Sequence, residues 1–476
     1  MMPYPPLGTL YAASYLRQHG ISVALHDVML AATEEEIVPA IAAAQPSVVA
    51  IYDDGFNYLS KMCLTRMRQA AFSMTQMAKE RGCTVVVFSS DATDHLEEYF
   101  RHGADYVICG EAEVTLAELV QFLTGSSSQT PEMINGLAFV RKGNIIKTGQ
   151  RKVLQDLDQL PFPAWDLVDL HRYRSAWKKH HGYFSLNMVT TRGCPFHCNW
   201  CAKPLYGQVY HARSPENVVA EMKYLKEFAQ PDHIWFADDI FGLKPGWVEK
   251  FAYHVQNEDA KIPFKCLARV DLLLERNTLQ QLREAGCETV WVGAESGSQK
   301  VLDAMEKGTT VEQIYRATSL LRRNGIRTGF FLQFGYPGED RDDILKTIGM
   351  VKDCMPDEIG ISVSYPLPGT KFYERVKNQL AGKQNWAVSQ DLDLMFAGEF
   401  SPDFYRMLHR VVHKQFKIWR GLRALKALFV HPGDRVRNKI RSIASMVYYG
   451  LTLPIDRIRL LALEKAPHAR INGYAD

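Results

Sequence analysis

The chain has 476 residues, which is enough for two or three domains with sizeable cores. Hydrophobic residues make up 46% of it and charged residues 23%, a balance that is ordinary for a globular protein. No stretch reaches about 18 consecutive apolar residues, and no basic segment followed by an apolar one opens the sequence, so we expect neither a membrane-spanning helix nor a secretory signal.

The net charge of +3 is unevenly distributed. Residues 403–476 hold 15 Lys and Arg against 5 Asp and Glu, whereas the residues before them are net acidic. A basic tail of this kind indicates an acidic partner or an anionic surface.

Nine cysteines are present, and they do not indicate a disulfide framework. Six are scattered, mostly in apolar segments, where we expect small buried hydrophobes: Cys63, Cys83, Cys109, Cys266, Cys287 and Cys354. The other three stand close together, and an exposed cluster of thiols indicates a reducing, cytosolic compartment.

Helix-like and strand-like segments alternate through residues 1–125. The predicted strands are 21–26, 47–52, 84–88 and 105–109, and the predicted helices are 7–18, 34–44, 58–81, 96–102 and 114–123. Such alternation predicts a parallel, doubly wound (Rossmann-like) sheet, in which ligands bind beyond the carboxyl ends of the strands. Those ends are residues 53–57, 89–91 and 110–111.

A polar stretch from Gly125 begins a linker, within which residues 137–141 and 144–147 are predicted to form a hairpin. From Phe184 the alternation resumes, with predicted strands at 185–190, 233–238, 264–268, 288–293, 327–334 and 358–364. Six β/α units predict a partial (β/α)6 barrel, two units short of a complete TIM-type barrel. We therefore expect domains at 1–125 and 183–400, a bridging segment at 126–182, and a helical extension at 401–476.

The three clustered cysteines, Cys194, Cys198 and Cys201, have the spacing C-x3-C-x2-C and follow the first predicted barrel strand. Thiolates are soft ligands suited to iron–sulfur clusters or to zinc. Three thiolates would leave one iron of a four-iron cluster open, and an open position characterises a reactive metal site. Two other interpretations stay open: zinc with His197 as fourth ligand, or buried cysteines that lie together by chance.

Polar residues also follow the other predicted barrel strands, at the edge where barrels keep their functional groups. Asp239 follows the second strand, Arg269 the third, and Glu295 and Ser296 the fourth. Carboxylates can accept hydrogen bonds from a ribose or an ammonium group, and arginine can pair with a carboxylate. Taken singly, Asp239 could cap the next helix and Arg269 could be a structural ion-pair partner.

The cysteine segment resembles the radical S-adenosylmethionine (SAM) superfamily, which usually has an aromatic residue before the third cysteine, here Trp200. The resemblance implies a [4Fe–4S] cluster on Cys194, Cys198 and Cys201, with SAM bound to the fourth iron. It also implies that an external flavodoxin- or ferredoxin-type donor drives reductive cleavage of SAM. The resulting 5′-deoxyadenosyl radical abstracts hydrogen from an unactivated carbon.

Three phrases near the N-terminus resemble the cobalamin-binding domain that precedes many radical SAM barrels: residues 5–11 (PPLGTLY), the loop after Phe88, and residues 105–119 (DYVICGEAEVTLAEL). This class includes methyltransferases and the anaerobic magnesium-protoporphyrin IX monomethyl ester cyclase. Two departures stand out: the first strand of such a domain is expected to be missing, and no Asp-x-His-x-x-Gly motif supplies an axial histidine. A Rossmann-like domain that has lost its ligand is the alternative.

Residues 292–310 (VGAESGSQKVLDAMEKGTT) closely resemble the SAM-contacting segment of the same class. The resemblance implies that Glu295 and Ser296 contact SAM, and it places Asp239, Arg269 and Trp200 in the same pocket.

The C-terminal region differs in kind from the rest of the chain. Residues 404–429 predict an amphipathic helix with a cationic stripe, and residues 442–455 carry no charge. The region is expected either to lie on an anionic membrane surface or to pack on the barrel with its basic face in solvent. No nucleic-acid-binding motif accompanies the basic residues, so we expect no nucleic acid as partner.

Together these patterns predict a cobalamin-dependent radical SAM enzyme that methylates an unactivated carbon of a lipophilic or natural-product small molecule. The alternative keeps the radical chemistry without cobalamin, and oxidises, cyclises or couples carbons. We expect a cytoplasmic protein, with membrane association depending on the C-terminal region.

Overall fold

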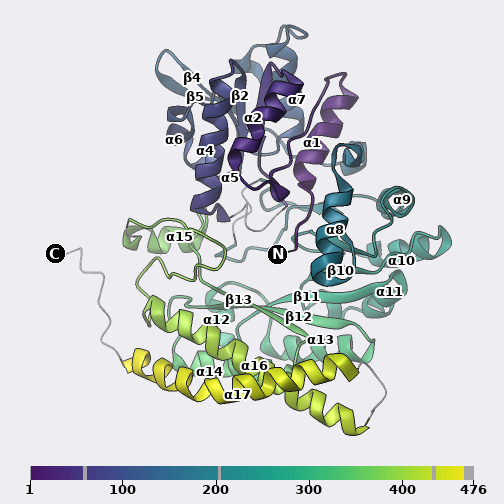
Figure 1. Ribbon diagram of the computed structural model, residues 1–476, viewed down its shortest axis with the longest axis vertical. Coiled ribbons are helices and arrows are strands. Elements are labelled where there is room, and N and C mark those ends of the chain that lie inside the picture. Colours follow the sequence, from purple (N-terminus) through teal and green to yellow (C-terminus); the bar gives the residue numbers. More distant parts are fainter. Residues whose placement is uncertain (1, 57–61, 202–204, 381, 431–435, 466–476) are drawn as a thin grey trace, which may run out of the picture.

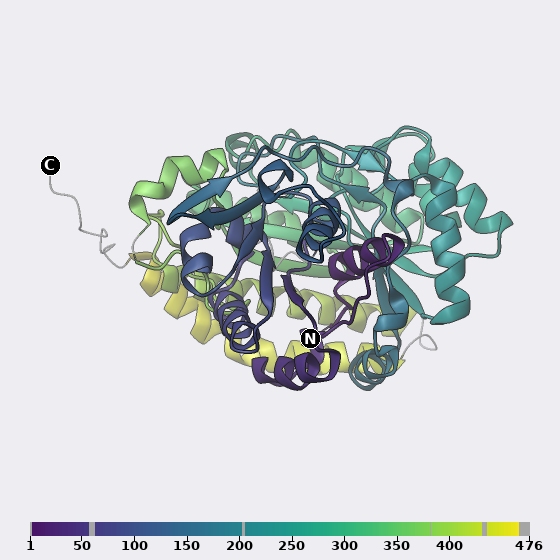
Figure 2. The same cartoon turned by 90° about the horizontal axis from the view of Figure 1, so that it is seen from above.

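The structure, a computed structural model, describes residues 2–56, 62–201, 205–380, 382–430 and 436–465. An N-terminal domain stands on a second, larger sheet, and two long helices cross the opposite side of that sheet (Figure 1). Seen from above, the N-terminal sheet overlies the larger one (Figure 2). The α/β class, the Rossmann-like domain, the partial barrel and the helical C-terminal region are confirmed.

The N-terminal sheet has five strands in the order β1-β2-β3-β4-β5. Its first three strands are parallel: β1 (Val48–Tyr52), β2 (Thr84–Phe88) and β3 (Tyr106–Ile108). The predicted hairpin, β4 (Leu137–Arg141) and β5 (Asn144–Lys147), pairs antiparallel with β3. The hairpin therefore extends the N-terminal sheet, although it lies in the segment that was expected to bridge the domains.

Helices cover both faces of this sheet. They are α1 (Leu7–Gln18), α2 (Ile37–Ala44), α4 (Thr65–Lys79), α5 (Ser90–Asp94), α6 (Leu96–Arg101) and α7 (Glu113–Leu123). The predicted helix 58–81 corresponds to α4, and residues 57–61 lie outside the described residues. Two apolar clusters, one on each side of β2, make up the core of the domain.

The predicted strand at 21–26 is wrong. Ile21, Val23 and Leu25 alternate with more exposed residues, which is the pattern of a half-buried strand. Ile21 and Val23 pack on the core of the domain, and Leu25 packs on the larger cluster that includes the barrel core. Their backbone, however, is not hydrogen-bonded to a neighbouring strand. Alternation of side chains reports burial on one side and does not by itself supply a pairing partner. Among the described residues, the first strand of the chain is β1.

The larger sheet has six parallel strands, and each lies beside its predecessor in the sequence. They are β6 (Ser185–Met188), β9 (His233–Phe236), β10 (Phe264–Ala268), β11 (Cys287–Glu295), β12 (Arg327–Phe334) and β13 (Glu358–Val363). The intervening helices are α9 (Pro215–Phe228), α10 (Trp247–Asn257), α11 (Thr278–Ala285), α12 (Gln299–Ala304), α13 (Val311–Arg323) and α14 (Arg341–Cys354). Because the strands are parallel, all their carboxyl ends meet at one edge, where the predicted site residues stand.

The C-terminal region is a pair of helices, α16 (Pro402–Val430) and α17 (Val436–Lys465). The first half of α16 buries Phe404, Leu408, Val412 and Phe416 in the barrel core. α17 packs along α16 (Figure 1). The expectation that the amphipathic helix packs on the barrel therefore holds for α16, whose basic face is turned away from the core.

Candidate active site

The cysteine loop begins where β6 ends and is fixed there by a buried carboxylate. Asp238, which follows β9, accepts hydrogen bonds from the backbone N–H groups of Thr190 (2.7 Å) and Thr191 (2.8 Å) and from the Thr190 hydroxyl (2.8 Å). Burial raises the pKa of Asp238 to about 6, although these hydrogen bonds oppose the rise. Asp238 thus anchors the strand end, and the neighbouring Asp239 is exposed at the same edge.

Gly193 makes the turn into the first cysteine. Its φ is +78°, and a Cβ atom at this position would collide with the carbonyl oxygen of Val209. Glycine is therefore required immediately before Cys194 on both conformational and steric grounds.

Asn199 ties the middle of the cysteine loop to the segment that follows β11. Its backbone N–H donates to the Met305 carbonyl (3.0 Å) and its amide nitrogen to the Ala304 carbonyl (2.7 Å). Its amide oxygen accepts from the Tyr336 hydroxyl (2.7 Å), and its carbonyl accepts from the backbone N–H of Phe372 (3.0 Å). This buried side chain, which no sequence motif singles out, holds the loop against the segments that follow β11, β12 and β13.

The thiols of Cys194, Cys198 and Cys201 are reduced and partly exposed, whereas five of the six scattered cysteines are buried and Cys109 is half-buried. Within the described parts of the chain, no three His, Cys, Asp or Glu side chains converge on a position for one metal ion. A cubane cluster does not require such convergence, since each thiolate binds a different iron. Three soft, accessible ligands on one loop fit a [4Fe–4S] cluster.

Lys307 links the cysteine loop to Glu295, at the end of β11. Its ammonium group lies 2.9 Å from the Glu295 carboxylate and 5.8 Å from the centre of the Trp200 ring. Burial lowers the pKa of Lys307, but the nearby charges of Glu295 and Cys198 outweigh it and keep the pKa above its ordinary value. In the sequence, Lys307 is distinguished only by its place in the same segment, 292–310, as Glu295.

The end of β11 is shaped around this ion pair. Glu295 has a φ of +56°, an unusual conformation for a residue with a side chain. A Cβ at Gly293 would stand 2.5 Å from a Glu295 carboxylate oxygen and 2.6 Å from the Lys307 nitrogen. The indole nitrogen of Trp200 is buried and has no acceptor among the described residues, which fits a site that receives a polar ligand.

Arg269 braces the cysteine loop from the third strand. Its guanidinium group lies 3.6 Å from the centre of the Phe196 ring, donates to the Lys307 carbonyl (3.0 Å) and pairs with Asp271 (3.0 Å). Ser296 is fully buried, and its hydroxyl is hydrogen-bonded to that of Thr347 in α14 (3.1 Å). The structure thus brings Arg269 and Glu295 to the cysteine loop, which itself carries Trp200, whereas the Ser296 hydroxyl is bonded to α14.

A buried ionic contact joins the cysteine loop to the N-terminal domain. Arg192, in β7 (Thr191–Arg192), donates to the carboxylates of Glu111 and Glu113, the latter at 2.6 Å, and none of the three side chains is more than 3% exposed. Burial raises the pKa of Glu111, and Arg192 opposes that rise. The Tyr206 ring lies 5.2 Å from the Arg192 guanidinium group and stacks on Phe56. The carboxyl ends of β1 and β3 therefore face the cysteine loop.

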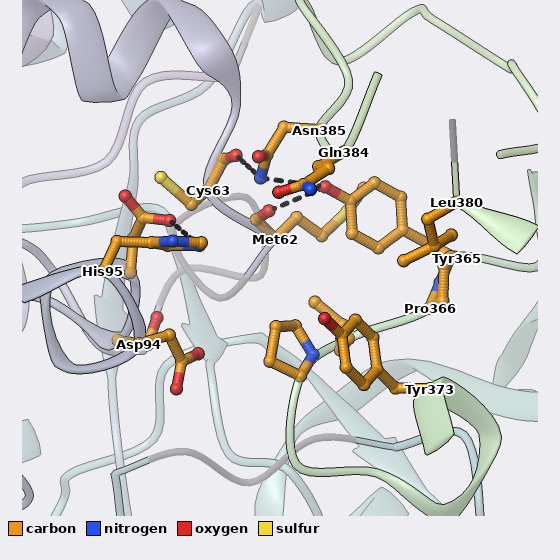
Figure 3. Close-up of a pocket in the computed structure, with 14 residues that line it drawn as sticks. Met62, Cys63, Asp94, His95, Tyr365, Pro366, Tyr373, Leu380, Gln384 and Asn385 are labelled. Atoms are coloured by element: carbon orange, nitrogen blue, oxygen red, sulfur yellow. Dashed lines mark hydrogen bonds and ion pairs between the residues drawn. The ribbon is translucent and has the colours of Figure 1, made fainter. Parts of the chain in front are cut away.

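A pocket opens between the N-terminal domain and the segment that follows β13 (Figure 3). His95 and Asp94 border it from the carboxyl end of β2, and Tyr365 and Tyr373 border it from beyond β13. Its volume is about 560 Å³, which includes space open to solvent. The Tyr365 hydroxyl donates to the Met62 carbonyl (3.1 Å), so both domains shape the same wall.

Comparison with known proteins identifies both parts of the chain. Residues 188–351 match the radical SAM superfamily, and residues 2–120 match the B12 binding domain. Among curated proteins, an uncharacterized methyltransferase of Pyrococcus horikoshii is 27% identical over 93% of this chain and 94% of its own length. The anaerobic magnesium-protoporphyrin IX monomethyl ester cyclase of Rubrivivax gelatinosus is 25% identical over 79% of this chain and 67% of its own.

Solved structures share the fold. The cobalamin-dependent SAM radical enzyme OxsB, with aqua-cobalamin bound, has a TM-score of 0.69 and 19% identity over 95% of this chain and 69% of its own. The radical SAM methyltransferase TsrM of Kitasatospora setae has a TM-score of 0.67 and 18% identity over 80% of this chain and 74% of its own. With its three-cysteine loop, six-stranded partial barrel and N-terminal domain, the chain is a radical SAM enzyme with a B12-binding domain.

Proposed function

We propose that this enzyme is a cobalamin-dependent radical SAM methyltransferase. The observation that carries the proposal is the buried contact of Arg192 with Glu111 and Glu113. It holds the loop with Cys194, Cys198 and Cys201 against the carboxyl ends of the N-terminal strands, where doubly wound sheets bind their ligands. The two cofactor regions are thus parts of one site.

When bound, the cluster with SAM supplies a 5′-deoxyadenosyl radical, and cobalamin supplies the methyl group. Cys194, Cys198 and Cys201 would hold the cluster. Lys307 places a cation beside Cys198 and offsets the negative charge of the thiolates. Glu295 would accept hydrogen bonds from SAM, and Trp200 offers both a ring face and a free indole N–H.

The remaining predicted residues are Arg269 and Ser296, which would position other groups, and Asp239. Arg269 is occupied by Asp271 and two backbone carbonyls, so it would position Phe196 and the 307–308 turn rather than bind a carboxylate of SAM. Ser296, bonded to Thr347, would fix the end of β11. Asp239 is an exposed carboxylate at the ligand edge and remains a candidate SAM contact.

Cobalamin would lie against the carboxyl ends of the N-terminal strands, within reach of the pocket in Figure 3. His95, Asp94 and Asn385 offer polar contacts there, and Tyr365 and Tyr373 offer ring faces. The residues around the pocket are compatible with a large ligand that has amide groups and an extended planar surface.

A lipophilic small-molecule substrate is part of the proposal. Pro366, Leu367, Pro368 and Leu380 contribute an apolar stretch to the pocket wall. A hopanoid C-3 methylase of Methylococcus capsulatus is 23% identical over 92% of this chain and 82% of its own, which supports a lipid-like substrate. Electrons would come from an external flavodoxin- or ferredoxin-type donor in the cytoplasm.

The second candidate is radical oxidation, cyclisation or carbon–carbon coupling without cobalamin, and the similarity to a cyclase supports that type of reaction. Metal content separates the two. Protein purified without oxygen from cells supplied with cobalamin should contain about four irons and about one cobalt per chain. Iron without cobalt would reject the methyltransferase and leave the second candidate.

SAM cleavage tests the cluster assignment. After reduction, the wild-type protein should form 5′-deoxyadenosine from SAM, and Cys198→Ala should lose both iron and cleavage. Cys109→Ala, at a half-buried cysteine outside the motif, should keep both. Cleavage that survives in Cys198→Ala would show that the assigned cysteines do not hold the cluster. Transfer of a labelled methyl group from SAM to product would confirm methylation.

A further inference from the structure

Helix α17 exposes a continuous row of large apolar side chains. From Tyr448 to Leu461 the members of this apolar row recur every three or four residues, and Ile440 and Val447 precede them at a spacing of two turns; each is between 48% and 75% exposed: Ile440, Val447, Tyr448, Leu451, Ile455, Ile458 and Leu461. At 3.6 residues per turn, this spacing places them along one side of the helix. Soluble proteins rarely expose apolar residues in such a contiguous patch without a binding partner.

The opposite side of α17 is fixed against α16. Gly421 of α16 allows the two helices to approach closely, because a Cβ there would collide with Met446. Lys414 of α16 pairs with the buried Asp456 (2.6 Å) and donates to the Thr452 hydroxyl (2.9 Å). The orientation of α17 is therefore set by polar and steric contacts, and the apolar row is held outward.

Cations flank the apolar row, and the acidic groups of this helix are already neutralised. Arg441, Arg457 and Arg459 are exposed. In residues 440–465 the acidic side chains are Asp456, which pairs with Lys414, and Glu464, which pairs with Arg341 at 2.8 Å. The face thus presents apolar side chains between arginines, the combination typical of helices that lie in the interface of an anionic membrane.

We infer that this face of α17 docks on the surface of a bilayer that contains anionic lipids. The helix would lie in the plane of the membrane, since none of the described helices combines the length and apolar character needed to cross a bilayer. The apolar row runs from Ile440 to Leu461, a contact line of about 30 Å along the helix axis. Figure 1 shows α17 at the end of the molecule away from the N-terminal domain, so docking leaves the interdomain pocket uncovered.

Charge favours a membrane over a second copy of the chain as occupant. If two α17 helices met face to face, the arginines that flank each apolar row would approach one another, and the described residues of the face offer no free carboxylate to pair with them. An anionic lipid surface supplies the missing negative charge. This inference does not depend on the proposed function, because it uses no residue of the active site.

Co-sedimentation with vesicles tests the inference. The full-length protein should bind vesicles of phosphatidylcholine that contain about 30% phosphatidylglycerol, and it should bind vesicles of phosphatidylcholine alone more weakly. It should dissociate from the anionic vesicles as the salt concentration is raised. The double variant Leu451→Glu/Ile458→Glu should lose binding at least tenfold. The double variant Arg457→Glu/Arg459→Glu should lose anionic selectivity, by about fivefold for each arginine removed.

Tyr253→Glu provides the matched control, because Tyr253 is a 64% exposed apolar residue on α10, outside the α17 face. It should bind vesicles as the wild type does, and unchanged SAM cleavage in all variants should show that the fold is intact. Failure of the wild-type protein to bind anionic vesicles would overturn the inference. So would equal loss in Tyr253→Glu, or light scattering that shows a dimer dissociated by Leu451→Glu/Ile458→Glu in the absence of vesicle binding.

Discussion

Arg192 is the residue whose loss should most disturb the junction of the two domains. It supplies the cation for two buried carboxylates, Glu111 and Glu113, and each of the three side chains is at most 3% exposed. In Arg192→Met, a side chain of similar length keeps the packing against Tyr206 but removes the charge. Two carboxylates are then left in an apolar contact without a cation.

Removal of one partner from a buried ion pair costs about 3–5 kcal/mol, whereas replacement of the whole set by neutral groups is often close to neutral. We therefore expect Arg192→Met to lower the free energy of unfolding by about 3–5 kcal/mol. Addition of Glu111→Gln and Glu113→Gln should recover more than half of the loss, since the glutamines keep the shape and remove the charge. Glutamine at 111 can still accept the hydrogen bond from the Leu154 backbone N–H (2.6 Å).

Urea unfolding followed by tryptophan fluorescence measures these differences, at pH 8 and at pH 5.5. Burial raises the pKa of Glu111, and Arg192 opposes that rise, so in its absence the folded-state pKa of Glu111 lies further above the unfolded value and the loss of stability grows as pH rises through that interval. Arg192→Met should thus be closest to the wild type at the lower pH. Arg327→Met is the control, because Arg327 is half-exposed and 3.4 Å from Glu288, a pair worth less than about 1 kcal/mol. A loss below about 1 kcal/mol in Arg192→Met, or no recovery in the triple variant, would refute the reasoning.

Three further predictions concern the site and its surroundings. Gly293→Ala should displace the Lys307–Glu295 pair and weaken SAM binding in equilibrium dialysis, whereas Gly349→Ala in α14, where a Cβ meets nothing within 4 Å, should leave it unchanged. Cys198→Ala should lose iron while Cys109→Ala retains it, as determined by iron analysis. Burial raises the pKa of Glu339 to about 8, so the folded chain keeps a proton there that the unfolded chain releases near pH 4.5. Wild-type stability should therefore fall from this group as pH rises from 4.5 to 8, and Glu339→Gln should gain a few kcal/mol relative to the wild type between pH 6 and 8.5 in urea unfolding. If the free energy of unfolding changed equally with pH in the wild type and in Glu339→Gln, this prediction about Glu339 would be wrong.

Local patterns were enough to predict most of the strands of both sheets. β2 and β12 match their predicted ranges because each is a short apolar run between helical segments. The strand at 21–26 fails because its alternation reports one-sided burial and not backbone pairing. α8 (Leu170–His181) was not predicted, since only Tyr173 and Trp177 are buried on an otherwise polar helix.

The site residues also fall into those that local sequence patterns predict and those that depend on contacts between distant segments. The spacing of Cys194, Cys198 and Cys201 is a local property, so the ligand set could be predicted from the sequence. The role of Lys307 depends on contact with a loop about a hundred residues earlier, and the partners of Arg192 lie in another domain. Asp238 and Asp239 are adjacent, and sequence alone could not decide which carboxylate anchors the loop and which faces solvent.

The N-terminal segment is part of the barrel core as well as of its own domain. Carbonyls of Pro3 and Pro5 accept hydrogen bonds from Trp177 (2.6 Å) and Asn187 (3.1 Å), and the Tyr11 hydroxyl accepts one from the buried Arg213 (3.0 Å). Deletion of the N-terminal domain would remove these acceptors from Trp177 and Asn187 and both carboxylates from Arg192, at a cost of about 1–3 kcal/mol for each neutral group and more for the arginine. Arg213 would keep its ion pair with Glu221.

Loss of SAM cleavage after such a deletion would therefore follow from damage to the cysteine loop, whether or not the domain binds cobalamin. The deletion cannot separate the two candidate chemistries. The cobalt content of the intact protein can distinguish the two chemistries, because it reports on the N-terminal domain without disturbing the contacts that hold Cys194, Cys198 and Cys201 in place.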